Sequence, residues 1–116
     1  MVRRKEIKEN YRVGSGDIFL TIYFGDAQFG SSAVVFDNEI LGIGEINQLK
    51  IGRGTEIIGK TLKIKSTVTD VNDKTNHTSI TYKFTGGVSD QEFRFSEDVE
   101  EEGDSIIYRA EFTFVS

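Results

Sequence analysis

The chain has 116 residues, a formal net charge of −5, and neither cysteine nor proline. This length suits one domain, residues 1–116, and leaves no room for separate cofactor and substrate domains. Without cysteine there is no disulfide, thiolate zinc site, iron–sulfur cluster or cysteine nucleophile, and the single histidine, His77, supplies no histidine cage for a metal. The negative charge argues against a nucleic-acid partner. No apolar run is long enough to predict membrane insertion.

Charge is distributed unevenly along the chain. Residues 1–12 carry five basic and two acidic groups, whereas residues 88–116 carry two basic and nine acidic groups. We interpret residues 1–12 as a basic N-terminal arm or an edge segment of the domain. The oppositely charged ends either meet each other or meet different partners. No apolar stretch follows the basic start, as it would in a signal peptide, and this favours a cytoplasmic location.

Alternating apolar and polar residues predict strands along most of the chain. The first predicted strand follows the Gly-Ser-Gly break at 14–16 and covers 17–24, where every second side chain is aliphatic or aromatic. The segment 33–36 is apolar on both faces, as in a central strand. Further strands are predicted at the segments that alternate in the same way: 61–69, 80–85, 93–95 and 106–114.

Three other segments carry different signals. Arg3–Asn10 is the best candidate for a helix, and 45–58 is ambiguous between the helical and the extended period. The polar residues 72–76 are interpreted as the loop of a hairpin that joins the segments 61–71 and 77–86.

Taken together, these segments predict an all-β fold. We expect a single antiparallel β-sandwich of about seven to nine strands, immunoglobulin-like in architecture. A small β-barrel is the alternative arrangement for this number of strands. The sandwich is favoured because the strands are long and alternate cleanly, so that two sheets can share one core.

The segment Gly54–Thr61 matches G-x-x-x-x-G-K-[ST], the spacing of a phosphate-binding loop. Such a loop has to open a helix whose N-terminal amides hold the phosphates. Here the residues from Thr61 onward have the period of a strand, and Ile57 and Ile58 stand where a tight loop favours small residues. The match therefore supports a nucleotide-binding enzyme only as a distant alternative.

Asp70, Asn72 and Asp73 gather side-chain oxygens within one turn, and calcium takes six to eight oxygen ligands. The string resembles the D-x-N-D-N calcium linker of cadherins over four residues, although Lys74 stands where that linker has its second asparagine. The resemblance implies a calcium site at these residues. Aspartate and asparagine also form turns through hydrogen bonds to their own backbone, so turn chemistry is the competing interpretation.

Two aromatic side chains are the candidates for an interaction surface. Phe19 and Tyr23 lie on the face of segment 17–24 opposite its aliphatic side chains. If that face is covered, both belong to the core. If it is uncovered, they form an apolar stripe of the kind that binds a protein or a carbohydrate.

The function is inferred from the chemistry that the sequence offers. No combination of nucleophile, base and orienting group can be named, so neither catalysis nor a cofactor is predicted. We expect a non-catalytic interaction or structural module that docks protein partners and is a monomer or a weak oligomer when isolated. A ligand-binding module for calcium or carbohydrate is the alternative.

Overall fold

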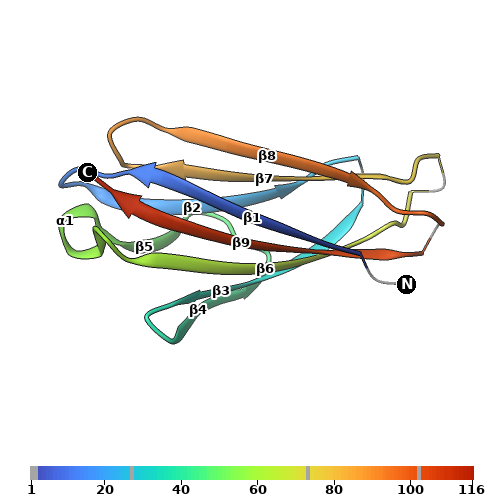
Figure 1. Ribbon diagram of the computed structural model, residues 1–116, viewed down its shortest axis with the longest axis horizontal. Helices are drawn as coiled ribbons and strands as arrows, with labels where there is room; N and C mark the ends of the chain where they lie inside the picture. The colour runs from blue at the N-terminus through green and yellow to red at the C-terminus, as the bar shows by residue number, and fades with distance from the viewer. Residues whose placement is uncertain (1–2, 27, 73, 102) are drawn as a thin grey trace.

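The computed structural model describes residues 3–26, 28–72, 74–101 and 103–116, which form two packed β-sheets (Figure 1). The expected β-sandwich is confirmed. The alternative of a small barrel is wrong, because the strands form two separate sheets and do not close on one another. The strands in the described residues are β1 (Arg3–Arg12), β2 (Asp17–Phe24), β3 (Phe29–Phe36), β4 (Glu39–Gly44), β5 (Leu49–Arg53), β6 (Thr61–Thr69), β7 (His77–Thr85), β8 (Gln91–Asp98) and β9 (Ser105–Val115).

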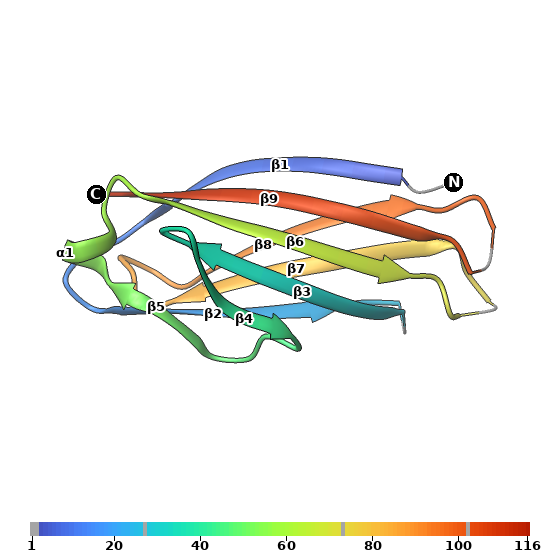
Figure 2. The same cartoon turned by 90° about the horizontal axis from the view of Figure 1, so that it is seen from below.

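The five-stranded sheet has the order β1-β9-β6-β3-β4, and the four-stranded sheet has the order β5-β2-β7-β8. All neighbouring strands are antiparallel except β1, which pairs with β9 in parallel. The first strand therefore forms one edge of the larger sheet, above β9 in Figure 2.

The helix considered for Arg3–Asn10 is wrong, because these residues lie in β1. The two apolar side chains near this segment that reach the core, Ile7 and Tyr11, are four positions apart. A spacing of four fits both the turn of a helix and the alternation of a strand, so it could not distinguish the two. The ten-residue ladder with β9 stabilises the extended form.

The hairpin expected at 72–76 is also wrong. The strands on its two sides belong to different sheets, because β6 pairs with β3 and β9 while β7 pairs with β2 and β8. The two-residue hairpin that the structure does contain joins β3 to β4 at Asp37 and Asn38. Both residues have positive φ, as a type I′ turn requires.

Alternating side chains from both sheets meet in the core, as the sequence predicts. The inward residues of β9, for example, are all buried: Ile106, Tyr108, Ala110, Phe112 and Phe114. Phe84 of β7 lies at the centre of an aromatic group, with its ring centroid 4.8 Å from Phe112 and 5.0 Å from Tyr11. Contacts between such rings add to the free energy of burying them.

Three of the buried side chains in this core are tyrosines with ionisable hydroxyls. Burial raises the pKa of Tyr11, Tyr82 and Tyr108 above the ordinary value for a phenol. The Tyr108 hydroxyl lies 2.8 Å from that of Thr78, and the Tyr11 hydroxyl donates to the carbonyl of Ser89 at 2.8 Å. Hydrogen bonding thus compensates part of the desolvation of Tyr11 and Tyr108.

The one helical element of the described chain is α1 (Gly54–Ile57), a single turn between β5 and β6. The segment 45–58, ambiguous in sequence, is therefore divided between an irregular connection, β5 and this turn. Within the described residues, no helix has the length and apolar character needed to cross a membrane.

Candidate functional site

The sandwich is open along one side, where two short strands end before their neighbours. β5 pairs with β2 only over Asp17–Leu20, and β4 pairs with β3 only over Ser32–Phe36. In Figure 2 the chain leaves β4 and passes below β2 to reach β5. The last residues of β2 and the first residues of β3 therefore have a strand neighbour on one side only.

An open groove of about 490 Å³ lies at this place, and we call it the β2–β3 groove. Two of its aromatic side chains are well exposed, Tyr23 at 49% and Phe29 at 66%. Ligand sites in proteins commonly have a volume of this order. The groove is lined by Ile22, Tyr23, Phe24, Gln28, Phe29, Gly30, Ser31, Gly44 and Glu45.

The floor of the groove depends on a glycine. A Cβ atom at Gly30 would lie only 2.5 Å from ring carbons of Phe24, so a larger residue would displace that ring. Phe24 is partly buried and packs against the core. Gly30 and Phe24 together therefore hold an aromatic surface between the two sheets.

Gln28 fixes the end of the groove. Its side-chain carbonyl accepts hydrogen bonds from the backbone amides of Val71 at 2.7 Å and Asn72 at 3.0 Å. Its side-chain amide donates to the backbone carbonyls of His77 at 3.1 Å and Thr75 at 3.4 Å. These bonds join the residue before β3 to the β6–β7 connection, so they fix the position of Gln28 at the edge of the groove.

The backbone of β2 contributes hydrogen-bonding groups to the groove. The amide of Ile22 donates to the carbonyl of Ile46, whereas the amide of Gly25 donates toward β7, to the carbonyl of Ser79. Because backbone groups alternate in direction along a strand, the amide of Phe24 points away from β7, on the same side as that of Ile22. The groove thus combines apolar surface, backbone donors and acceptors, and the exposed carboxylate of Glu45.

The two aromatic residues named from the sequence occupy different surroundings. Tyr23 lines the groove, whereas Phe19 is half-buried beside its cross-strand neighbours Lys50 and Thr85. Thr21, between them, is buried and accepts a hydrogen bond from the amide of Gln48. Phe19 and Tyr23 therefore do not form one continuous stripe.

Phe29 is the groove residue that sequence reasoning missed. It stands outside the apolar run 33–36, in a stretch whose glycine and serines look like a connection. The signal that could have identified it is the pair of aromatic residues Phe24 and Phe29 on either side of one turn.

The segment that matches a phosphate-binding loop is built differently from one. α1 is a single turn, and Thr61 begins a strand, as the sequence predicts. A Cβ at Gly54 would collide with the backbone carbonyl of Gly14, so that glycine serves close packing between segments. The ammonium group of Lys60 lies 2.7 Å from the carboxylate of Asp37 and near the ring of Phe36.

Two of the three residues proposed for calcium, Asp70 and Asn72, lie in the described chain, and their side chains have different surroundings. Asp70 is buried, and neither of its carboxylate oxygens has a hydrogen-bond partner among the described residues. The side chain of Asn72 donates to the carbonyl of Asp26 and accepts from the amide of Lys74, which is turn chemistry. Asp73 lies outside the described residues.

The described residues also contain no group of three or more histidine, aspartate or glutamate side chains arranged to hold a metal ion. Calcium binding at Asp70, Asn72 and Asp73 remains a prediction from the sequence.

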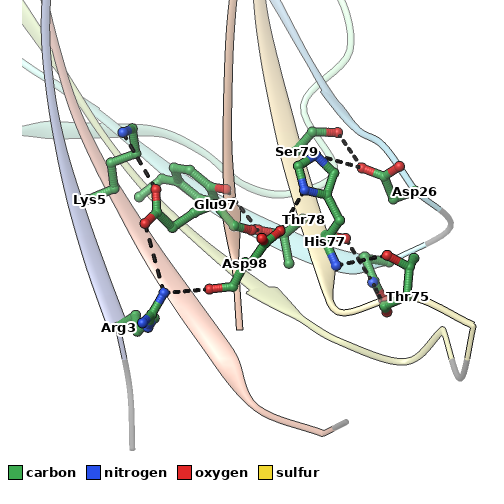
Figure 3. A network of polar contacts seen from close by, with 11 residues as sticks. Arg3, Lys5, Asp26, Thr75, His77, Thr78, Ser79, Glu97 and Asp98 are labelled. Atoms are coloured by element: carbon green, nitrogen blue, oxygen red, sulfur yellow. Dashed lines mark hydrogen bonds and ion pairs between the residues drawn. The ribbon is translucent and has the colours of Figure 1, made fainter. Parts of the chain in front are cut away.

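A polar network lies beside the β6–β7 connection, around His77 (Figure 3). Nδ1 of His77 is 2.6 Å from the carboxylate of Asp98, and its Nε2 is 3.9 Å from that of Asp26. The hydroxyl of Ser79 donates to Asp26, at 3.1 Å, rather than to the histidine. This geometry therefore does not pair a nucleophile with a base, although serine, histidine and aspartate are neighbours.

On the other side of this network, β1 and β8 are joined by ion pairs between the two sheets. The carboxylate of Glu97 lies 3.9 Å from Arg3 and 3.6 Å from Lys5 (Figure 3). The basic first strand and the acidic end of β8 therefore meet in space, one of the two arrangements expected from the uneven charge.

The groove is the feature of the described chain that best combines exposure, apolar surface and backbone hydrogen-bonding groups. Its chemistry has to be argued from its own residues, since comparison with known proteins supplies no precedent. No protein-family model matches the chain, and neither a curated protein nor a solved structure matches it.

Proposed function

We propose that this protein is a non-catalytic, immunoglobulin-like interaction module that docks a short, extended segment of a protein partner in the β2–β3 groove. One observation carries the proposal: the last residues of β2 and the first residues of β3 have a strand neighbour on one side only, beside an apolar groove that exposes Tyr23 and Phe29. Nine strands in two sheets also suit an immunoglobulin-like module of this size.

An extended peptide suits the groove for two reasons. Its backbone could add to a strand edge, as in domains that bind peptides by β-augmentation. Its alternate side chains could then contact the surface formed by Phe24 and the rims formed by Tyr23 and Phe29. The small volume, about 490 Å³, favours a short segment over a folded domain.

The polar contacts elsewhere in the molecule support binding rather than catalysis. The Ser79 hydroxyl is bonded to Asp26, and Lys60 is paired with Asp37. Both side chains are therefore engaged in contacts that hold the fold together. The groove itself contributes mainly aromatic, aliphatic and backbone groups, together with one carboxylate.

The test begins with selection of peptides from a displayed library of random short peptides against the full chain. The dissociation constant of each selected peptide is then measured for the wild type and for the double variant Tyr23→Ser/Phe29→Ser. We expect the double variant to bind at least tenfold more weakly, because both aromatic rims are removed.

Val88→Ser is the matched control, because Val88 is also exposed, at 61%, but does not line the groove. It should leave the affinity unchanged. The proposal is wrong if every selected peptide binds the double variant as tightly as the wild type. If an oligosaccharide array is bound instead, and through Tyr23 and Phe29, carbohydrate replaces peptide as the ligand.

A further inference from the structure

The outer face of the five-stranded sheet carries a charge opposite in sign to that of the whole chain. Its charged side chains on β1, β9 and β6 are six cations and two anions, hence +4, in a chain of net charge −5. We call this surface the cationic face. Its cations are Arg4, Lys8, Arg12, Lys63, Lys65 and Arg109, and its anions are Glu6 and Glu111.

Two of the cations stand directly opposite each other on neighbouring strands. Lys65 of β6 is the cross-strand partner of Arg109 of β9. Like charges in this position destabilise a sheet. Among the described residues, no ion pair involves Lys63, Lys65 or Arg109. Arg109 has Glu6 and Lys63 has Glu111 as a further cross-strand neighbour, but neither pair forms an ion pair in the described chain, and the face keeps an excess of four positive charges.

The cations lie next to an apolar border. On β3, Ala33 is paired with Lys65, and Val35 with Lys63. Beyond them, β4 presents Ile40 and Ile43, which are 64% and 69% exposed. One row across the sheet therefore runs from Arg109 through Lys65 and Ala33 to Ile43.

A shallow depression of about 340 Å³ lies within this row. Ala33 and Val35 line it together with three cations, Lys63, Lys65 and Arg109, and one carboxylate, Glu111. A small alanine between long cationic side chains leaves room for an apolar side chain from another molecule. The surrounding ammonium and guanidinium groups would then meet carboxylates.

From this geometry we infer a second docking surface: the cationic face binds a partner protein segment in which apolar side chains are flanked by aspartate or glutamate. We infer an acidic partner because the face has a net charge of +4, and carboxylates on the partner would be complementary to it. The inference does not depend on the β2–β3 groove, which is lined by other residues.

The same features favour a protein segment over an anionic membrane. Glu6 and Glu111 lie among the cations, and a lipid surface of uniform negative charge would repel both. The depression at Ala33, of about 340 Å³, has room for one or two protruding side chains and fits them better than a flat layer of headgroups. A peptide can place its carboxylates beside the cations and avoid the two glutamates.

The test uses two synthetic peptides with leucine at the same positions, one with glutamate and the other with lysine at all remaining positions. Amide chemical shifts of the full chain are recorded during each titration. We expect the glutamate peptide to shift the amides of Ala33, Lys63, Lys65 and Arg109, and the lysine peptide to leave them unchanged. Raising the salt concentration should weaken the binding, because exposed charges are screened.

The double variant Lys65→Glu/Arg109→Glu should weaken binding of the glutamate peptide at least tenfold. It keeps like charges at the two opposed positions but removes the favourable pairing of Arg109 with Glu6 of β1, so a modestly lower melting temperature is expected and folding is verified by circular dichroism before affinities are compared. Lys74→Glu/Arg94→Glu, at exposed positions away from this face, makes the same change in net charge and should retain the affinity.

Three results would overturn the inference. The two peptides could bind equally, the glutamate peptide could shift amides elsewhere, or both double variants could lose the same affinity. Phosphatidylserine vesicles and a concentration series of the protein alone are measured in parallel. If either the vesicles or a second copy of the chain occupies these amides and the glutamate peptide does not, the partner is a membrane or the protein itself.

Discussion

Lys65 and Arg109 are cross-strand partners on the outer face of the five-stranded sheet, two cations at directly opposed positions. Replacing Lys65 by glutamate would place opposite charges there. We expect Lys65→Glu to raise the free energy of unfolding by about 0.2–1 kcal/mol while it weakens binding of the glutamate peptide. Urea denaturation measures the first effect. An unchanged or lowered free energy would show that the opposed cations do not destabilise the sheet.

Gln28 should contribute more to stability than an ordinary surface glutamine. Its side chain makes four hydrogen bonds to backbone groups of the β6–β7 connection. Gln28→Ala would leave these partially buried groups without partners, and we expect a loss of about 2–3 kcal/mol in chemical denaturation. Gln91→Ala, at an exposed position of β8, is the control and should cost less than about 0.5 kcal/mol. Equal losses in the two variants would contradict the role assigned to Gln28.

The buried tyrosines predict unfolding at alkaline pH. A tyrosine in the unfolded chain loses its proton near pH 10, whereas burial raises the pKa of Tyr11, Tyr82 and Tyr108 in the folded chain. Above about pH 10 the unfolded state therefore binds fewer protons than the folded state. The free energy of unfolding should then fall as pH rises, by up to about 1.4 kcal/mol per pH unit for each tyrosine.

Tyrosinate absorbance and circular dichroism, followed together from pH 8 to pH 12, test this prediction. Tyr82→Phe should make the decline with pH shallower, because one buried phenol no longer ionises on unfolding. Tyr23→Phe is the control, since Tyr23 is 49% exposed, and it should leave the slope unchanged. In the Tyr23→Phe variant, whose three remaining tyrosines are all buried, tyrosinate that forms while the fold is intact would show that these phenols are accessible and that the prediction is wrong.

The variant Asp70→Asn distinguishes two roles for this side chain: a calcium ligand, or a buried carboxylate that only costs stability. Neither of its oxygens has a hydrogen-bond partner among the described residues. We expect Asp70→Asn to raise the free energy of unfolding by about 1–3 kcal/mol, because a neutral side chain is less costly to bury there. Glu92→Gln, at an exposed position, should change it little. Thermal melts with and without several millimolar calcium complete the experiment.

If Asp70 is a calcium ligand, Asp70→Asn should instead be less stable than the wild type when calcium is present. Calcium at one hundred times its dissociation constant would stabilise the wild type by about 2.7 kcal/mol. The variant would lose this gain. We expect no such shift, because the side chain of Asn72 is engaged in hydrogen bonds with the carbonyl of Asp26 and the amide of Lys74, as in a turn.

Segments of β2, β3, β6, β7, β8 and β9 were predictable from the sequence, because alternation is a local property, whereas β1, β4 and β5 were not predicted as strands. In β6, Leu62, Ile64 and Val68 alternate with lysines and threonines, and all three are buried as expected. The partner of each strand is not local information. The loop at 72–76 shows this, since it connects the two sheets although its composition resembles that of a hairpin.

The groove was predictable only in part. Tyr23 could be identified because it stands on the polar face of an alternating strand. The contribution of Phe29 and Gly44 follows from where β4 and β5 stop, and a sequence pattern does not give those positions precisely enough. The burial of Asp70 could not be predicted either. The inward alternation of β6 continues one position beyond the end of the strand and buries this carboxylate.

A partner segment that adds to the open strand edges in the β2–β3 groove would accept a hydrogen bond from the amide of Phe24, so hydrogen exchange of that amide is the decisive measurement. The amide of Gly25, bonded to the carbonyl of Ser79, is the internal reference and should be equally protected in both states. When the groove is saturated with a selected peptide, we predict that exchange of the Phe24 amide slows at least tenfold. Saturation with no change in the exchange of that amide would contradict the proposed strand addition.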